Sequence, residues 1–423
     1  MKIEHFRVKN FRCFEDEEWD FAPQVNLIVG ENGTGKSAFL DALAFGLEAL
    51  ASQFTHLPLQ FDPQSTRVVS SPNSLVMRWI DYAEAQIVAE IDSETYDWIR
   101  NRSGSQTTQL DHPNNLFLYA TRFLSNDLKS LEANLQLIAY YRSQRNCSTQ
   151  NGEQYSLQGA ISRFSAYENC LNVSISQHSF LEWFRRIEFA SLKRGHSFGT
   201  LDSVKEAIRT TIPGVKDITY EPLDDKLYVQ FEDGHYLPLS HLSDGYRNML
   251  TMVMDIAYRA SVLNPHLEDF SKTEGIVLID EIDLHLHPKW QREAIGGLVR
   301  TFPNLQFFLT THSPFIIQSL EASENAKLIN LSEPENTEYR RLSIEDIAEE
   351  TQGVEGVSRS AKYHEMEDTA AEYYRLLEES KTTAPEEIDA LKQKLDTLLE
   401  PFSHDPAYSA FLKFRRACAG VDA

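Results

Sequence analysis

The stretch that decides the fold is GENGTGKS, Gly30 to Ser37, which fits the phosphate-binding pattern G-x-x-x-x-G-K-S at every fixed position. The apolar run VNLIV before it predicts a strand, and KSAFLDALAFGLEAL after it has the apolar spacing of a helix. A glycine-rich loop in this context aims backbone N–H groups and the positive end of a helix at phosphate oxygens. The sequence therefore predicts a P-loop that binds a nucleotide.

The two side chains at the fixed Lys and Ser positions of this pattern have different expected roles. Lys36 reaches the β- and γ-phosphates, and the hydroxyl of Ser37 coordinates Mg²⁺. We expect the nucleotide to be ATP with Mg²⁺, and we expect it to be bound by Asn32, Gly33, Thr34, Gly35, Lys36, Ser37 and Ala38.

A second stretch, GIVLIDEIDLHLHPKWQ at 275–291, holds three carboxylates and two histidines. It suits either a metal-hydrolase centre or a carboxylate pair that serves a nucleotide bound elsewhere. The P-loop favours the second interpretation. Asp280 ends a buried strand and is the carboxylate expected to hold Mg²⁺, and Glu281 is the candidate general base. His285 and His287 are then poor metal ligands, because no third ligand lies nearby in the sequence and Pro288 favours a helix start.

Two further patterns extend the nucleotide site. LSDGYRN at 242–248 places Ser243 at the N-cap of an expected helix, with Asp244 and Gly245 beside it. The N-terminus of such a helix is a second candidate phosphate-binding site. FFLTTHSP at 307–314 reads as a strand that ends before His312. A single histidine at a strand end is more often structural, and this one follows the Asp-Glu pair by about 30 residues.

Together these motifs resemble the ABC ATPases of the SMC/RecF class, in the order Walker A, signature, Walker B with glutamate, D-loop and switch histidine. The opening VKNFRCFED is similar to the first hairpin of that class. The resemblance implies that Arg12 contacts the nucleotide, that Asp283 occupies the D-loop position and that His312 binds the γ-phosphate. It also implies a Q-loop glutamine that contacts nucleotide and metal. Gln144 is the candidate, and Gln136 is the alternative.

DEIDLHLHPKWQ and the C-terminal DPAYSAFLKFRR resemble the PtuA-like ATPases of Septu and retron-linked anti-phage systems more closely. That resemblance implies a homodimer or higher oligomer around two Mg-ATP and a partner HNH nuclease of the PtuB-like kind. A retron reverse transcriptase with its non-coding DNA is a further implied partner. The chain would then be an ATPase switch subunit without nuclease activity of its own, since GVEG at 353–356 has no strand before it and too few residues after it for a Toprim domain.

Composition narrows the rival functions. The chain has 423 residues with 40 lysines and arginines against 63 aspartates and glutamates, a net charge of −23. A RecF-like DNA-repair ATPase that binds DNA itself is the main alternative, but an acidic chain is a poor DNA binder unless basic residues gather locally, as at 183–196 and 411–416. We expect DNA contact mainly through partners. A transporter subunit is a weaker alternative.

The remaining features predict a cytoplasmic protein with three parts. Four scattered cysteines suit a reducing compartment, and no long apolar run predicts a membrane helix. We expect an α/β P-loop NTPase of the ABC, SMC/RecF-like type with an inserted, largely helical lobe and a helical C-terminal tail. The expected boundaries are 1–50 and 236–342 for the ATPase head, 51–235 for the lobe and 343–423 for the tail.

Overall fold

The structure is a computed structural model, and it describes most of the chain up to residue 332. The described residues are 1–55, 66–70, 77–80, 82–103, 107–111, 113–124, 133–143, 162–171, 177–194, 199–267, 269–320 and 324–332, with isolated positions from 343 onward.

A parallel sheet of five strands forms the centre of the ATPase head. Its order is β15 (Ala326–Asn330), β3 (Val25–Val29), β14 (Leu305–Thr310), β13 (Gly275–Ile279) and β9 (Leu137–Tyr141). All neighbouring pairs are parallel. The four strands from β3 to β9 are buried along their whole length, as expected of a parallel sheet covered on both faces. The residues that follow β3, β13, β14 and β9 therefore meet at one edge of the sheet.

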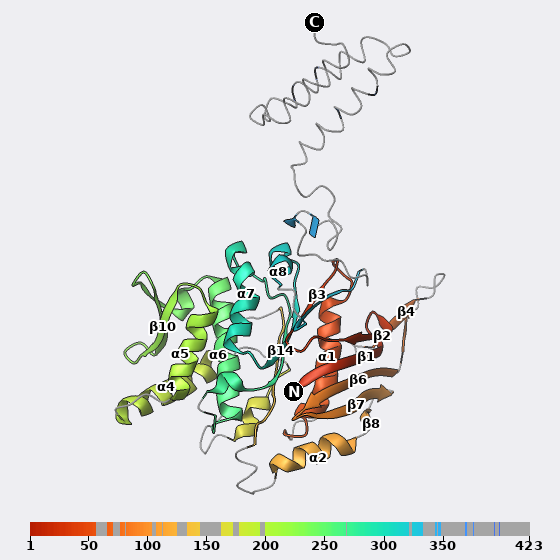
Figure 1. Cartoon of the computed structure of the whole chain (residues 1–423), viewed down its shortest axis with the longest axis horizontal. Helices are drawn as coiled ribbons and strands as arrows, with labels where there is room; N and C mark the ends of the chain where they lie inside the picture. The colour runs from red at the N-terminus through yellow and green to blue at the C-terminus, as the bar shows by residue number, and fades with distance from the viewer. Residues whose placement is uncertain are drawn as a thin grey trace. The chain divides into compact units, whose positions relative to one another are not determined.

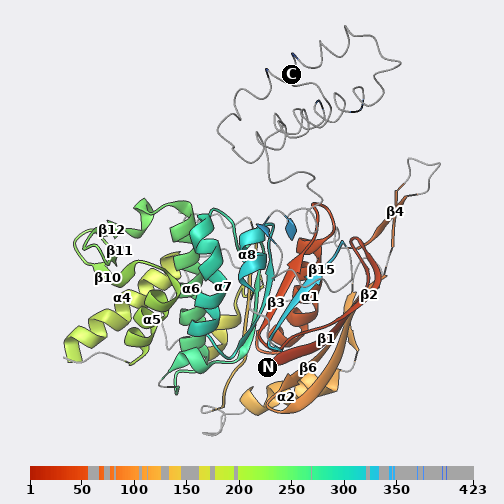
Figure 2. The ribbon, with the colours of Figure 1, turned by 45° about the horizontal axis from the view of Figure 1, so that its top comes forward.

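A second, antiparallel sheet lies on the far side of helix α1 (Lys36–Ala51), which packs between the two sheets (Figures 1 and 2). The strand order is β2 (Phe14–Asp20), β1 (Lys2–Phe11), β6 (Tyr82–Ile91), β7 (Glu94–Ser103) and β8 (Thr107–Asp111). Helix α2 (Pro113–Leu124) packs against β7. A short separate hairpin joins β4 (Val68–Ser70) to β5 (Met77–Trp79).

The opposite face of the parallel sheet carries a group of helices (Figure 1). These are α4 (Gln177–Arg194), α5 (Gly199–Thr211), α6 (Asp244–Leu263), α7 (Pro288–Thr301) and the short α8 (Pro314–Ser319). Beyond them an antiparallel sheet is formed by β10 (Val215–Glu221), β11 (Lys226–Phe231) and β12 (Tyr236–Pro238). One turn of 3-10 helix, Arg163–Tyr167, contacts α6.

Most strands and helices of the head follow the sequence expectation, and the inserted lobe differs in one respect. The first hairpin, the P-loop helix, the strand before Asp280 and the helix over 288–301 are all present. The lobe, however, contributes three strands that extend the β1–β2 sheet. In β6 every second residue from Ala83 to Ala89 is buried, so the alternation fits one face of a sheet on α1. The described helical parts of the lobe include the 3-10 turn and α4.

Residues 1–347 form one unit and residues 348–423 form another. The expected tail helices, the basic cluster at 411–416 and GVEG at 353–356 lie outside the described residues. None of the helices in the described part of the chain has the length and apolar character needed to cross a membrane.

Candidate nucleotide site

The P-loop connects β3 to α1 and is held in shape by contacts to its own backbone. Gly35 has φ of 105°, and a Cβ there would meet the sulfur of Cys13 at 2.4 Å, so only glycine fits. The ammonium group of Lys36 donates to the carbonyl oxygens of Gly30 and Glu31, both at 2.8 Å. The lysine thus lies folded over the loop, in the place where its charge can meet the phosphates.

Two of the three expected Mg²⁺ ligands, Ser37 and Asp280, lie side by side at the edge of the sheet. The hydroxyl of Ser37 is 2.9 and 3.1 Å from the two carboxylate oxygens of Asp280, although 243 residues separate them in sequence. Asp280 also accepts a hydrogen bond of 2.7 Å from Thr310 at the end of β14. A hydroxyl and a carboxylate in contact are the oxygen ligands that Mg²⁺ takes, so the residues present fit this ion.

Glu281 is held in an unusual backbone conformation. Its φ is 51°, in the left-handed region that costs a non-glycine residue about 1 kcal/mol or more. Its N–H donates to the hydroxyl of Thr310 at 2.7 Å, which fixes the turn directly after Asp280. Thr310 therefore bonds to both residues of the Asp-Glu pair. A strained backbone such as that of Glu281 is typical of a functional residue.

His312 lies half-buried beside the same charges. Burial lowers the pKa of His312 below its usual value, and the positive charge of Lys36 lowers this pKa further, while Asp283 and Asp280 raise it less. Burial also lowers the pKa of Lys36, and Asp280, Glu281 and Asp283 oppose that shift. Lys36 and His312 thus share Asp280 and Asp283 as charged neighbours.

The D-loop is anchored to the segment after β14 and to helix α7. Asp283 accepts a hydrogen bond of 2.6 Å from the hydroxyl of Thr311. The amide of Gln291 donates to the backbone of Leu286 at 3.0 Å, and its oxygen accepts from Ser313 at 2.7 Å. His287 caps α7, because its ring accepts from the N–H of Lys289 at 3.2 Å.

The signature turn packs on the D-loop segment of its own chain. Ser243 is the N-cap residue of α6, as predicted, and it is exposed, but its hydroxyl makes no capping bond. A Cβ on Gly245 would meet the carbonyl oxygen of His285 at 2.3 Å, so the close approach requires glycine. The next residue, Tyr246, makes an edge-to-face contact with Trp290 of α7. The signature turn is therefore in close contact with the D-loop segment and with the start of α7.

Two predicted residues around this core have clear positions and one does not. Arg12 occupies the turn between β1 and β2 and pairs with Asp41 of α1 at 2.5 Å. Gln136 precedes β9, at the end of the sheet away from the P-loop, and accepts from the amino group of Met1 at 2.8 Å. That position rules out Gln136 as the Q-loop glutamine. Gln144 lies outside the described residues.

Sequence reasoning missed several residues that shape the site. Thr310 and Thr311 belong to the FFLTTHSP stretch, and their position at the end of a strand before His312 is the only sequence signal that marks them. Ser332, after β15, accepts from the N–H of Glu31 in the P-loop at 2.9 Å, and no local pattern marks it. No local pattern assigns a role to Gln291 either.

The P-loop lies beside an Asp-Glu pair at the end of a strand in an all-parallel sheet, and β14 separates the P-loop strand from the Asp280 strand. This arrangement defines a P-loop ATPase of the ABC type. Two family models match the chain: an AAA domain described as "putative AbiEii toxin, Type IV TA system" over residues 114–318, and an AAA domain over residues 5–208.

Among curated proteins, the chain is similar to a retron Vc95 probable ATPase of Vibrio cholerae, with 25% identity over 72% of this chain and 68% of that one. It is 26% identical to the Septu protein PtuA of Bacillus mycoides over 93% of this chain, and it spans about half (50%) of the length of that protein. The chain is less similar to the solved structure of an SMC head bound to the C-winged helix domain of ScpA. The sequence identity is 16%, the TM-score is 0.45, and the match covers 77% of this chain and 96% of that one. The predicted resemblance to retron-linked and Septu ATPases is confirmed by these relatives.

Proposed function

We propose that this chain is the ATP-hydrolysing switch subunit of a bacterial anti-phage defence complex and that it regulates a partner nuclease. One observation carries the ATPase part of the proposal. The Ser37 hydroxyl, the Asp280 carboxylate and the Thr310 hydroxyl form one connected group, with Glu281 as the next residue. The names of the retron and Septu relatives support the defence part.

In the proposed reaction, phosphoryl transfer to water is promoted by positioning and charge. Bound Mg²⁺ would supply positive charge to the phosphates, and Ser37 and Asp280 are the residues that would hold it. Lys36 carries the neighbouring positive charge to the β- and γ-phosphates. Glu281 orients a water molecule and accepts its proton, and His312, kept neutral by its lowered pKa, is able to donate one hydrogen bond to the γ-phosphate.

We further propose that each site is shared between two chains. The sequence contains one P-loop and one signature. The exposed Ser243, whose hydroxyl makes no capping bond, stands at the start of a helix of 20 residues and is available to a nucleotide on a second copy. Two chains would then enclose two Mg-ATP head-to-tail, with Asp244, Gly245 and Asp283 near the shared phosphates, and higher oligomers could form from such dimers.

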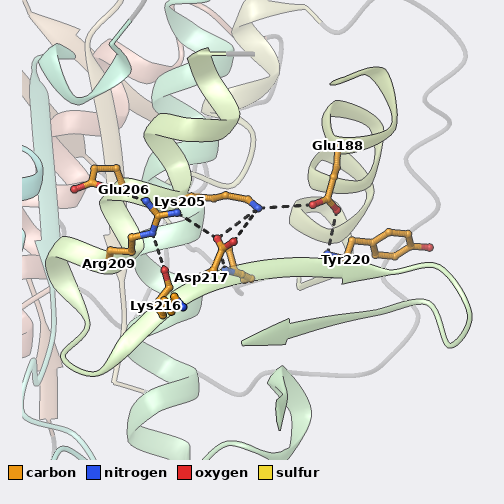
Figure 3. A network of polar contacts seen from close by, with 8 residues as sticks. Glu188, Lys205, Glu206, Arg209, Lys216, Asp217 and Tyr220 are labelled. Carbon is orange, nitrogen blue, oxygen red and sulfur yellow. Dashed lines mark hydrogen bonds and ion pairs between the residues drawn. The ribbon is translucent and has the colours of Figure 1, made fainter. Parts of the chain in front are cut away.

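The partner proposal is an HNH-type nuclease, and in a retron setting also a reverse transcriptase with its DNA. We propose that the head comprises residues 1–50 and 236–342 together with the strands β6 to β9, which complete its two sheets, and that the rest of 51–235 and the segment 343–423 supply docking surfaces. Charge supports contact with DNA through partners. In the lobe, Lys205 lies 3.4 Å from Asp217 and 3.8 Å from Glu188 (Figure 3). Arg185 of the basic cluster pairs with Asp225 at 3.5 Å.

The test of the ATPase switch is the mass in solution and the phosphate release of the wild type and of Glu281→Gln, with and without Mg-ATP. We expect Glu281→Gln to stop phosphate release and to accumulate an ATP-dependent dimer, because binding persists without hydrolysis. Glu293→Gln, an exposed change on α7, is the matched control and should behave as wild type. Unchanged phosphate release in Glu281→Gln would remove Glu281 from the mechanism.

The test of the defence role uses cells that carry this chain with its neighbouring genes. Plaque counts should fall in the presence of the wild-type system and return to the level of unprotected cells with Glu281→Gln. Duplex DNA binding by the pure chain, weakening steeply with salt, would instead favour a RecF-like repair ATPase.

A further inference from the structure

A second arginine lies at the nucleotide edge of the sheet, on the strand next to the one that carries Asp280. Arg142 directly follows β9. The N–H of Asp280 donates to the carbonyl oxygen of Tyr141 at 2.8 Å, so the two strands end at the same level. Arg142 is therefore a neighbour of Asp280 and Glu281 across the strand ends, where the reacting end of a nucleotide bound to the P-loop would lie.

Asp41 gathers Arg142 and Arg12 at the first turns of the P-loop helix. It stands one helical turn after Ser37, on the same face of α1. Arg12 is 2.5 Å from one of its carboxylate oxygens, and Arg142 is 2.9 Å from the other. The hydroxyl of Tyr140 donates to the second oxygen at 3.0 Å. The two guanidinium groups thus come from β9 and from the β1–β2 turn, and one carboxylate fixes both.

The two cations of the cluster reach solvent, whereas the carboxylate that holds them is buried. The side chain of Asp41 is only 7% exposed, whereas those of Arg12 and Arg142 are 33% and 45% exposed. A guanidinium carries five N–H donors in a fixed plane, so one arginine can bridge a carboxylate and a phosphate. Its stacking on the ring of Tyr140, 4.9 Å from the ring centre, orients that plane.

We propose that Arg142 binds the terminal phosphate of the nucleoside triphosphate, and that Asp41 and Tyr140 are positioning residues that hold it there. This inference rests on the proposed ATPase function. Arg142 would favour the triphosphate over the diphosphate, because only the triphosphate places charge beside the ends of β9 and β13. Arg12, on the other side of Asp41, is placed to contact the same nucleotide.

The experiment measures dissociation constants for fluorescent ATP and ADP in the Glu281→Gln chain, so that ATP is not consumed. We expect Arg142→Ala to weaken ATP binding about 10- to 100-fold, the usual range for one charged hydrogen-bonding group, and to change ADP binding less than about twofold. Arg142→Lys should recover part of the loss, since it restores charge without the planar fork. Tyr140→Phe should give a smaller loss that is again confined to ATP.

The control is Arg209→Ala, which removes an arginine from the ion-pair network of the lobe and should leave both constants unchanged. Equal weakening of ATP and ADP in Arg142→Ala, or no weakening of either, would overturn the role given to Arg142. Failure of the parent Glu281→Gln chain and of the Arg209→Ala control to bind ATP would be a different result, because it would remove the proposed ATPase function itself. Thermal unfolding of each variant confirms that it is folded before its constants are compared.

Discussion

Two ionic clusters in this molecule are built from the same residue types and differ in their charge balance. At the nucleotide edge, Arg12 and Arg142 share the single carboxylate of Asp41. In the lobe (Figure 3), Lys205 and Arg209 are met by Glu188, Glu206 and Asp217. The lobe cluster has three carboxylates for two cations, and it joins α4, α5 and β10. The cluster on α1 presents two partly exposed guanidinium groups at the edge of the sheet where the P-loop lies, which is where an anion would bind.

The largest expected effect is that of removing the P-loop cation. Lys36→Met keeps the side-chain stem and removes the charge, so we expect ATP affinity to fall at least about 100-fold, because the phosphates lose a charged donor in a partly buried site. Lys289→Met on the exposed start of α7 is the matched control. Titration with fluorescent ATP measures the affinity of both variants. Equal affinity in the two would contradict the role of Lys36 in binding the phosphates.

The second prediction concerns the hydroxyl that links Asp280 to Glu281. Thr310→Val keeps the shape of a fully buried side chain and leaves the N–H of Glu281 without its acceptor. We expect a loss of about 1–3 kcal/mol in the free energy of unfolding and a fall of about tenfold or more in phosphate release, since the glutamate loses its position.

Two controls separate stability from catalysis for Thr310. Thr310→Ser retains the hydroxyl and should keep most of the phosphate release. Thr301→Val removes another buried hydroxyl, which bonds to Thr211 at 2.7 Å between α5 and α7. It should lower stability and leave the turnover of the folded protein unchanged. If it lowers turnover as much as Thr310→Val does, the link to Glu281 has no special role.

The lobe cluster should respond in stability alone. Lys205→Met leaves the carboxylates of Glu188 and Asp217 without their shared partner, and we expect a loss of about 1 kcal/mol in the free energy of unfolding. ATP affinity should remain that of the wild type. Denaturant unfolding and nucleotide titration on the same sample measure both quantities, and a loss of ATP affinity would show that the lobe cluster serves the site.

The smallest expected effect is a pH dependence set by His312. Because its pKa is lowered in the folded chain, the unfolded chain binds more protons as pH falls below about 6.5, the usual histidine value. The stabilising contribution is complete above that pH and is lost as pH falls through the lower folded value. Unfolding measured from pH 7.5 to pH 5 should show a shallower loss in His312→Gln than in the wild type. A steeper loss in the variant would contradict the lowered pKa.

The secondary structure of the head followed from the sequence wherever a pattern was local and strongly periodic. The P-loop between a strand and a helix, the buried strand before Asp280 and the proline-started helix at 288 each carry their signal within about ten residues. The β6–β8 strands were harder to predict. Small alanines alternate with polar residues in β6, a weak strand signal, and the strand is fixed by pairing with β1 about 80 residues earlier.

The sequence by itself determined the class of the chemistry: a phosphate-binding loop, an Asp-Glu pair, a signature and a histidine in a fixed order. Only the tertiary structure decided how these parts are held, because the deciding contacts join distant segments. Ser37 meets Asp280 across 243 residues, Gly245 approaches His285, and Asp41 joins the turn at Arg12 to the strand end at Arg142. A short motif indicates which chemical groups the reaction needs. Their distances and charge balance come from the parallel sheet, which brings the carboxyl ends of strands far apart in sequence to one edge.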